Sequence, residues 1–391
     1  MPVAPVIVYL TGYRQHAGKT VTSLASSRSS AACSIPSTIG YIKPVGQEVS
    51  TLRDGMQVDK DVQLLSVFSS LPGFEPRHLS PVRFTSGFTR NYLESGDQEA
   101  LTRTLERRIL ESVASLADKK VIIAEGSGHP GVGAIAGLSN ADVGNLLNAE
   151  IVFLSEGGIG RAIDTLEVYM SYFLHKRCRV RGVIFNKLIP EKIRTLQRYL
   201  TEDALNSRFP GFGGNLSILG FIPTVQDLPQ PSIDLVLNSL RHAEAIGDPR
   251  HPTWQRPCRT IRVISLPAQF LRPAQAIRRR DLVVISANSS PRIRSILSYH
   301  RQLGATRGIG GLVLTCDEGE SLAPELRAEI IGAGLPTVLI RGDSAATEAR
   351  LFGLYESTKL QVYDVDKVRE VEELFSASFD VYRFLDVFGI E

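Results

Sequence analysis

The chain has 391 residues, 43% of them hydrophobic and 22% charged, and carries a formal net charge of +3. This length exceeds one ordinary hydrophobic core, so two domains are expected, and the composition is typical of a folded globular protein. The small positive excess argues against nucleic acid as a partner. The densest basic run, residues 278–280, is interpreted as a solvated helix end or turn.

The cysteines and the apolar runs bear on location. The four cysteines are far apart and include no C-x-x-C pair, which predicts neither a zinc site nor a disulfide framework and favours a reducing compartment. The N-terminus lacks the charged region and cleavage site of a signal peptide, and no apolar run reaches the roughly 18 residues of a membrane helix. We therefore expect a cytoplasmic protein with no membrane partner.

Short runs rich in Val and Ile recur along the chain, and most are followed by a glycine-containing turn and a helical pattern. This alternation is typical of βα units on a mainly parallel sheet. The clearest expected strands of the first part are 6–11, 39–45, 121–125, 151–155, 180–186 and 216–221. Together they predict one doubly wound domain.

A proline-rich stretch, residues 224–257, follows these strands and contains the only tryptophan, Trp254. Such composition marks a connection between domains. Beyond it the alternation restarts, with expected strands at 260–266, 281–286, 311–315, 336–340 and 359–363. We therefore expect a first domain over residues 1–235 and a second, smaller α/β domain over residues 245–391.

A glycine-rich loop follows the first expected strand. Gly12 is separated by five residues, one more than in the commonest pattern, from Gly18, Lys19 and Thr20, and a helical pattern comes next. Strand, glycines and helix in this order indicate a P-loop, in which backbone N–H groups and the helix N-terminus face phosphate oxygens. Lys19 is expected to reach the terminal phosphates, and the Thr20 hydroxyl to bind Mg²⁺. The expected ligand is a nucleoside triphosphate with Mg²⁺, on a P-loop NTPase-type sheet.

Magnesium also needs carboxylate ligands. Glu125 ends the expected strand 121–125 and precedes Gly126, which puts its carboxylate at the carboxyl edge of the sheet, where ligands bind. Asp59 and Asp61 offer a further ligand, although an Asp at a helix start is equally typical of an N-cap.

Residues 1–235 resemble the dethiobiotin synthetase fold. The resemblance is carried by the five-residue spacing of the P-loop and by the segments 42–45, 125–128, 186–187 and 220–223. It implies that Lys43 assists Lys19 in stabilising the transferring phosphate and that Thr20, Glu125 and Asp61 hold Mg²⁺. It also implies that Asn186 and Pro223 line the adenine of ATP.

The chain also resembles, over nearly its whole length, the amino-terminal half of long bacterial phosphate acetyltransferases and their stand-alone homologues. Segments 80–82, 87–93, 147–152 and 308–315 carry this resemblance, which implies a DRTGG-like domain over residues 245–391. Residues 155–161 resemble, more distantly, the glycine-rich turn of cobyrinic acid a,c-diamide synthases. The 391 residues include no acetyltransferase catalytic domain, so acetyl transfer is not expected. They also include no Asp-Arg-Thr-Gly-Gly string, which leaves the ligand of the second domain open while its fold is still expected.

Four further side chains are weighed as candidates for the site. Arg90 and Arg161 lie in glycine-containing segments and suit an anionic substrate or the phosphate charge, because guanidinium matches carboxylate and phosphate geometry. His129 is either an acid or base near the phosphates or the donor of one structural hydrogen bond. His16, inside the P-loop, either touches a substrate or fills a tolerant loop position.

Two functions of different class stay open. One is an ATP-dependent, ligase-like enzyme that activates a carboxylate or carbamate by phosphoryl transfer and uses Lys19, Lys43 and Arg90. The other is a nucleotide-responsive regulatory module with an unknown small-molecule ligand in the second domain. Asn186-Lys187 without a following Asp favours adenine over guanine, and a homodimer is the default from symmetry statistics.

Overall fold

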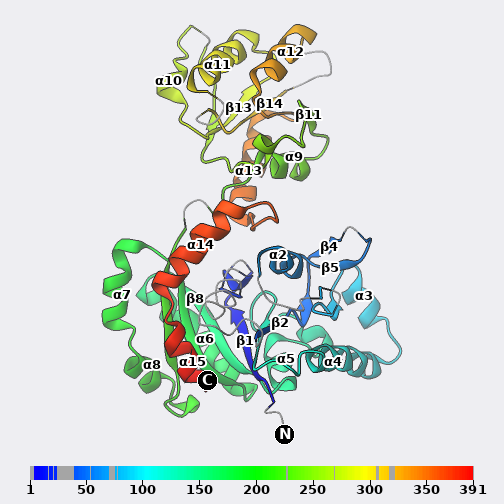
Figure 1. The fold of residues 1–391 in the computed structure, drawn as a ribbon, viewed down its shortest axis with the longest axis vertical. Coiled ribbons are helices and arrows are strands. Elements are labelled where there is room, and N and C mark those ends of the chain that lie inside the picture. The colour runs from blue at the N-terminus through cyan, green and yellow to red at the C-terminus, as the bar shows by residue number, and fades with distance from the viewer. Residues whose placement is uncertain are drawn as a thin grey trace. The chain divides into compact units, whose positions relative to one another are not determined.

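The computed structural model describes residues 4–15, 17–20, 22–23, 39–52, 54–69, 75–76, 78–225, 228–267, 269–304, 308–316 and 322–390. The chain forms two compact units, one of Met1–Val225 with Val365–Glu391 and the other of Gln226–Asp364 (Figure 1). Among the helices of these residues, none combines the length and apolar character needed to cross a membrane.

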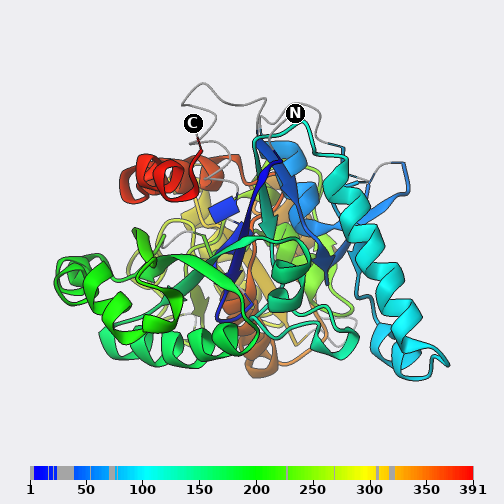
Figure 2. The same ribbon diagram turned by 90° about the horizontal axis from the view of Figure 1, so that it is seen from below.

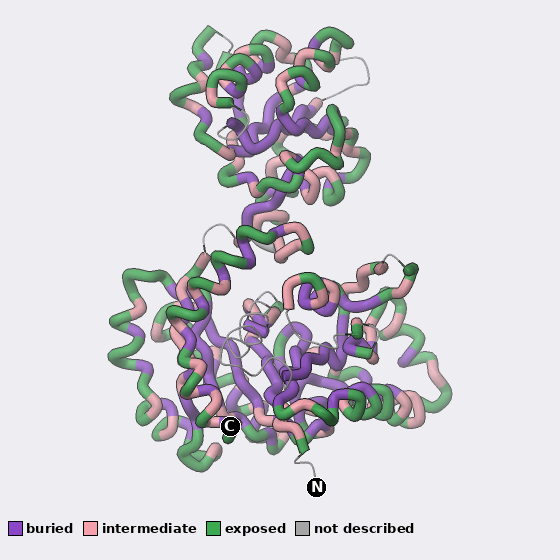
Figure 3. The backbone as a smooth tube through the Cα atoms, in the orientation of Figure 1, coloured by how far each residue is buried: buried purple, intermediate pink, exposed green. Residues whose placement is uncertain are grey.

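The first unit is built on a six-stranded sheet in the order β10-β9-β8-β1-β7-β2, with every pair parallel. Its strands are β1 (Val6–Gly12), β2 (Ile39–Ile42), β7 (Val121–Glu125), β8 (Glu150–Glu156), β9 (Arg179–Leu188) and β10 (Ser217–Pro223). The central strands are almost wholly buried because helices cover both faces (Figures 2 and 3). The expected doubly wound, mainly parallel sheet is confirmed.

Helices connect these strands, and the longest are α4 and α6. The helices between β2 and β10 are α2 (Lys60–Phe68), α3 (Phe88–Leu93), α4 (Gln98–Ala114), α5 (Asn140–Leu146), α6 (Ile159–His175), α7 (Ile193–Tyr199) and α8 (Glu202–Arg208). Each β-strand therefore delivers its carboxyl end to the same edge of the sheet.

The expected strand 39–45 is interrupted at Lys43 and Pro44. Proline has no N–H to donate to a sheet, so β2 ends at Ile42 and the chain continues in β3 (Val45–Gly46). β3 pairs with β6 (Val82–Arg83), while β4 (Val49–Thr51) and β5 (Gln57–Asp59) form an antiparallel pair that leads into α2. Lys43 consequently stands at a break in the sheet edge.

The last two helices belong to the first unit, whereas the sequence analysis expected them in the second domain. α14 (Val365–Ser378) and α15 (Val381–Phe388) pack against β10, the edge strand of the sheet. Phe379 forms a bridge with Gly220, and the Asp380 N–H donates to the Leu219 carbonyl. Their aromatic side chains explain the location, because Phe375, Phe379, Phe384 and Phe388 are all buried in a row of ring contacts.

The second unit has a five-stranded sheet in the order β11-β15-β14-β13-β12, in which only the β11 pairing is antiparallel. Its strands are β11 (Glu244–Ile246), β12 (Ile261–Val263), β13 (Leu282–Ser286), β14 (Gly311–Thr315) and β15 (Thr337–Leu339). Its helices are α9 (Ile233–Ser239), α10 (Pro273–Ala276), α11 (Ser290–Leu303), α12 (Pro324–Ala333) and α13 (Ser344–Ser357). Two separate apolar clusters pack against this sheet, as expected for a smaller α/β domain.

Residues 359–363, expected as a strand, form a turn instead. The Gln361 N–H donates to the Asp364 carboxylate, and the Asp364 N–H donates back to the Gln361 carbonyl. Tyr363 is held by a hydrogen bond between its hydroxyl and that of Ser232, at 2.9 Å. These local bonds leave the segment no sheet partner among the described residues.

The packing of α14 and α15 on β10 generates a stability prediction. Truncating Phe379 to Ala should lower the free energy of unfolding of the first unit by about 3–5 kcal/mol, the usual cost of removing a buried phenyl ring. Urea unfolding, followed by hydrogen exchange of β9 and β10 peptides, measures it. The matched control is Tyr382→Ala, whose side chain is 75% exposed and which should change stability by less than about 0.5 kcal/mol. Equal effects of the two changes would contradict the packing.

Candidate functional site

The P-loop leaves β1 at Gly12 and is fixed from β9. Gly18 has a φ of +94°, and a Cβ there would lie 2.2 Å from the Asn186 amide nitrogen, so no other residue fits. That amide donates a 3.0 Å hydrogen bond to the Ala17 carbonyl. Asn186, expected beside the base, thus holds the backbone of the loop.

Lys19 connects the P-loop to the loop after β7. Its side chain is buried, and its ammonium donates to the Arg14 carbonyl at 3.0 Å and to the Gly128 carbonyl at 2.9 Å. β1 and β7 are adjacent parallel strands, so their loops meet at the carboxyl edge of the sheet. The ammonium is therefore at the place where the sequence predicts terminal phosphates.

Two of the expected Mg²⁺ or phosphate residues, Thr20 and Lys43, meet at the carboxylate of a third, Glu125. The Thr20 hydroxyl donates to Glu125 Oε1 at 2.8 Å, and the Lys43 ammonium donates to the same oxygen at 2.8 Å. Lys43 also donates to Asp61 Oδ2 at 2.6 Å, while the Tyr41 hydroxyl donates to Glu125 Oε2 at 3.0 Å. We call these five residues the carboxylate cluster.

Asp59 and Asp61 divide the two roles that the sequence leaves open between them. Asp59 is the N-cap of α2 and accepts hydrogen bonds from the backbone N–H groups of Gln47, Glu48 and Asp61. Asp61, in the first helical turn, points its carboxylate to Lys43. Asp59 therefore shapes the segment, and Asp61 joins the carboxylate cluster.

Burial governs the ionisation of this cluster. Burial lowers the pKa of Lys43, but the nearby carboxylates of Asp61, Glu125 and Asp59 outweigh it and raise that pKa well above its usual value. Burial raises the pKa of Asp59 to about 6 even though Lys43 opposes the rise. Burial, followed by the Glu125 charge, raises the pKa of Tyr41. Lys43 is therefore charged and Tyr41 neutral.

The donor set fits a magnesium ion. It consists of the Thr20 hydroxyl and the Asp61 and Glu125 carboxylates, and oxygen ligands are those that Mg²⁺ prefers. One ammonium faces two buried carboxylates, so the cluster has excess negative charge. Within the described ranges there is no group of three or more His, Cys, Asp or Glu side chains that could hold a metal ion.

A second charged group borders the P-loop at the end of β8. One oxygen of Glu156 accepts from Arg14 at 2.8 Å and lies 3.3 Å from Arg161, and both guanidinium groups lie over the Tyr13 ring. Burial raises the pKa of Glu156 and lowers that of Lys187. Arg161, one of the sequence candidates, is thus brought next to the P-loop.

Arg90, His129 and Pro223 are less closely connected. Arg90 lies exposed on α3, and its side chain has no hydrogen bond or ion pair within the described part of the chain. His129 Nδ1 accepts a hydrogen bond from the Gly131 N–H, whereas the structural alternative expected the imidazole to donate one. Pro223 ends β10, paired in register with Leu188. His16 lies outside the described residues.

Sequence reasoning missed Tyr41 and Asn140. Tyr41 precedes Lys43 by two positions, so strand alternation could have placed both side chains on one face. Asn140 accepts hydrogen bonds from the Tyr9 hydroxyl and the Ser127 N–H, and it donates to the Ser127 and His129 carbonyls. No sequence motif marks Asn140, because its backbone partners, Ser127 and His129, lie in the loop that follows β7.

The carboxylate cluster generates a pH prediction for Lys43→Met. Leaving Asp61 and Glu125 buried without their ammonium should cost about 3–5 kcal/mol of stability above pH 7. Without Lys43 the pKa of Asp59 rises further above about 6, so the folded variant binds a proton that the unfolded chain does not. Its stability is therefore lost as pH rises through that pKa and recovered below it. Urea unfolding of wild type and variant at pH 5 and pH 8 tests this, and a deficit that does not shrink at pH 5 would contradict it.

Solved structures with similar folds were found at low similarity. They include the CBS and DRTGG domains of the regulatory region of Clostridium perfringens pyrophosphatase with diadenosine tetraphosphate (16% identity, 37% of this chain and 60% of that one, TM-score 0.26). A second is the signal recognition particle receptor FtsY of Elizabethkingia anophelis (13% identity, 47% of this chain and 50% of that one, TM-score 0.28). A third is a variant of Cyanothece McdA in complex with ATP (12% identity, 57% of this chain and 85% of that one, TM-score 0.32). The chain spans 60% of the first of these.

No curated protein matches the sequence. A family model described as an AAA domain, AAA_26, matches residues 7–232. The match covers the whole main sheet of the first unit, the P-loop and the carboxylate cluster. It extends over more than half of the chain, which therefore belongs to the AAA_26 family of nucleotide-binding P-loop NTPase domains.

Proposed function

We propose that the protein binds ATP with Mg²⁺ and, as a dethiobiotin synthetase-like enzyme, transfers the γ-phosphate to a carboxylate or carbamate with release of ADP. An amine then attacks the carbonyl of the resulting mixed anhydride and displaces inorganic phosphate. The observation that carries the proposal is the convergence of Lys19, Thr20, Lys43, Asp61 and Glu125 at the carboxyl edge of β1, β2 and β7. An ordinary P-loop needs one lysine, and a second buried ammonium suits a reaction in which negative charge moves between two oxygens.

The two lysines would stabilise different positions of the moving phosphoryl group. Lys19 donates to two main-chain carbonyls, and phosphate oxygens are stronger acceptors for the same N–H groups. Lys43 is held against Glu125 and Asp61, so its charge is preorganised rather than solvated. Preorganised charge of this kind is usually the largest single contribution to catalysis.

Magnesium, when bound, would neutralise phosphate charge, and Thr20, Asp61 and Glu125 are the residues proposed to hold it. Lys43 uses the same carboxylate oxygens, so a divalent cation and the ammonium compete for them. With ATP bound, the phosphate oxygens would become new hydrogen-bond acceptors for the Lys43 ammonium. Lys43 would therefore turn to the phosphates only when Mg²⁺ occupies Asp61 and Glu125.

The remaining site residues are proposed from their positions. Asn186 and Pro223 lie near the ends of the neighbouring strands β9 and β10, where the resemblance expects adenine. Arg90 has an exposed guanidinium that would bind an anionic group of the unknown substrate. A cytoplasmic location is part of the proposal, from the wide spacing of the four cysteines in the sequence. A homodimer stays the default stoichiometry.

A regulatory function is the second candidate, favoured by the connectivity. The second unit is inserted between β10 and α14, so two covalent connections join it to the first unit. A nucleotide that stiffens β10 could therefore act on both connections. Hydrogen exchange of residues 226–364 with and without a non-hydrolysable ATP analogue tests this function, and unchanged exchange would remove its support.

The enzyme proposal predicts the effect of Lys43→Met on turnover. ADP release, measured with the purified protein and small-molecule extracts, should fall at least ~100-fold, because one electrostatic stabiliser of a transition state is worth about 10²–10³ in rate. Nucleotide affinity should change far less. The matched control is Lys60→Met, at an exposed lysine that begins α2. Turnover that survives in the Lys43 variant would rule the proposal out.

A further inference from the structure

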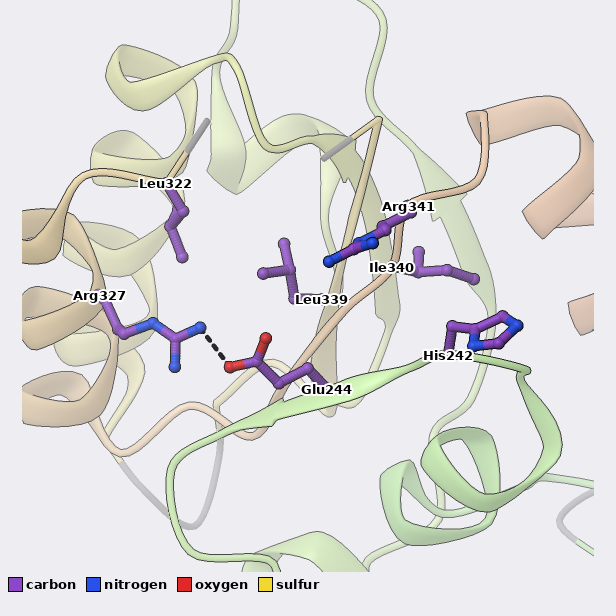
Figure 4. Close-up of a pocket in the computed structure, with 7 residues that line it drawn as sticks. All are labelled: His242, Glu244, Leu322, Arg327, Leu339, Ile340 and Arg341. Atoms are coloured by element: carbon purple, nitrogen blue, oxygen red, sulfur yellow. Dashed lines mark hydrogen bonds and ion pairs between the residues drawn. The ribbon is translucent and has the colours of Figure 1, made fainter. Parts of the chain in front are cut away.

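The second unit contains a pocket at the carboxyl end of β15. Its volume is about 340 Å³, and Figure 4 shows the side chains around it. The lining residues are His242, Glu244, Leu322, Arg327, Leu339, Ile340 and Arg341. β15 is parallel to β14 and β13, and ligands of open parallel sheets bind outside the carboxyl ends of the strands. The pocket therefore lies where this architecture places ligands.

The charges around the pocket are not balanced. The Arg327 guanidinium forms an ion pair with the Glu244 carboxylate, which neutralises both (Figure 4). Arg341 and His242 are exposed, and within the described ranges neither side chain has a hydrogen bond or ion pair. The pocket thus keeps one full positive charge, and an imidazole stands near it.

The surface of the pocket is mainly polar, although three aliphatic side chains lie beneath it. Leu339 and Ile340 are buried in the two apolar clusters of the unit, and Leu322 packs against one of them. The β11–β15 pairing sets Glu244 opposite Leu339, so the Arg327–Glu244 pair closes one side of the pocket. A mainly polar pocket with an unpaired guanidinium matches a small ligand with an anionic group.

Size and geometry narrow the ligand class. A volume of about 340 Å³ is near the lower end, roughly 300 Å³, of small-molecule sites, which suits a small metabolite better than a dinucleotide. The guanidinium fork of Arg341 can bind two oxygens of a carboxylate or phosphate at once. His242 has a φ of +57°, an uncommon conformation for a side-chain-bearing residue, and it sets the imidazole at the pocket rim.

We propose that this pocket binds a small organic anion, with Arg341 and His242 on its carboxylate or phosphate. The proposal is independent of the nucleotide site. It gives the second unit a ligand of stated chemistry, which neither the family match nor the first unit supplies.

The test uses the full chain carrying Lys19→Ala, so that the P-loop does not capture the probes. The probes are benzoate, phenyl phosphate and inorganic phosphate, titrated by calorimetry and followed by hydrogen exchange of residues 242–246 and 337–343. We expect saturable binding of benzoate or phenyl phosphate, with protection of both segments. Whichever binds more tightly identifies the anionic group as carboxylate or phosphate.

Two arginine variants decide whether the pocket is responsible. Arg341→Ala should weaken binding at least ~10-fold, and Arg341→Lys should restore part of it, because a lysine keeps the charge but loses the fork. Arg350→Ala, at an exposed arginine of α13 outside the pocket, should leave the affinity unchanged. Absence of saturable binding, equal affinity in Arg341→Ala, or equal affinity for inorganic and phenyl phosphate would overturn the proposal.

Discussion

The Lys43 ammonium lies between two buried carboxylates, those of Asp61 and Glu125. The contacts around it in the first unit maintain the geometry of this ion pair. A buried ion pair is costly unless its geometry is good and its remaining oxygens are bonded. Thr20 and Tyr41 meet that need at Glu125, and the N-cap of α2 directs Asp61. The proline after Lys43 ends β2 and gives the side chain this position. One interaction thereby joins β2, β7, α2 and the P-loop.

A small number of contacts likewise holds the P-loop. Asn186 fixes the loop backbone from β9, and its closeness to Gly18 leaves room for glycine alone. Lys19 bonds to the carbonyl groups of two loops, so the ammonium is already near the place where phosphate is expected. A site in which the charges are placed before the ligand arrives loses little free energy to reorganisation.

Much of the fold could be predicted from the sequence, because most of the buried parallel strands of both units are continuous runs rich in Val, Ile and Leu. The P-loop and Glu125 followed from the same pattern, since each comes directly after such a run. Local pattern could not show the return of α14 and α15 to the first unit. Phe375 and Phe379 mark an amphipathic helix but do not say which sheet edge it covers. The ion pair of Glu156 with Arg14 joins residues 142 positions apart, which no motif encodes.

Calorimetric titration of the purified chain with a non-hydrolysable ATP analogue and Mg²⁺, beside the Lys19→Ala variant, tests the central claim most directly. The account predicts saturable binding that requires Mg²⁺ and that the variant loses, because Lys19 supplies the charge that faces the phosphates. Absence of a binding heat in the wild type, or equal binding heats in the two proteins, would contradict this prediction.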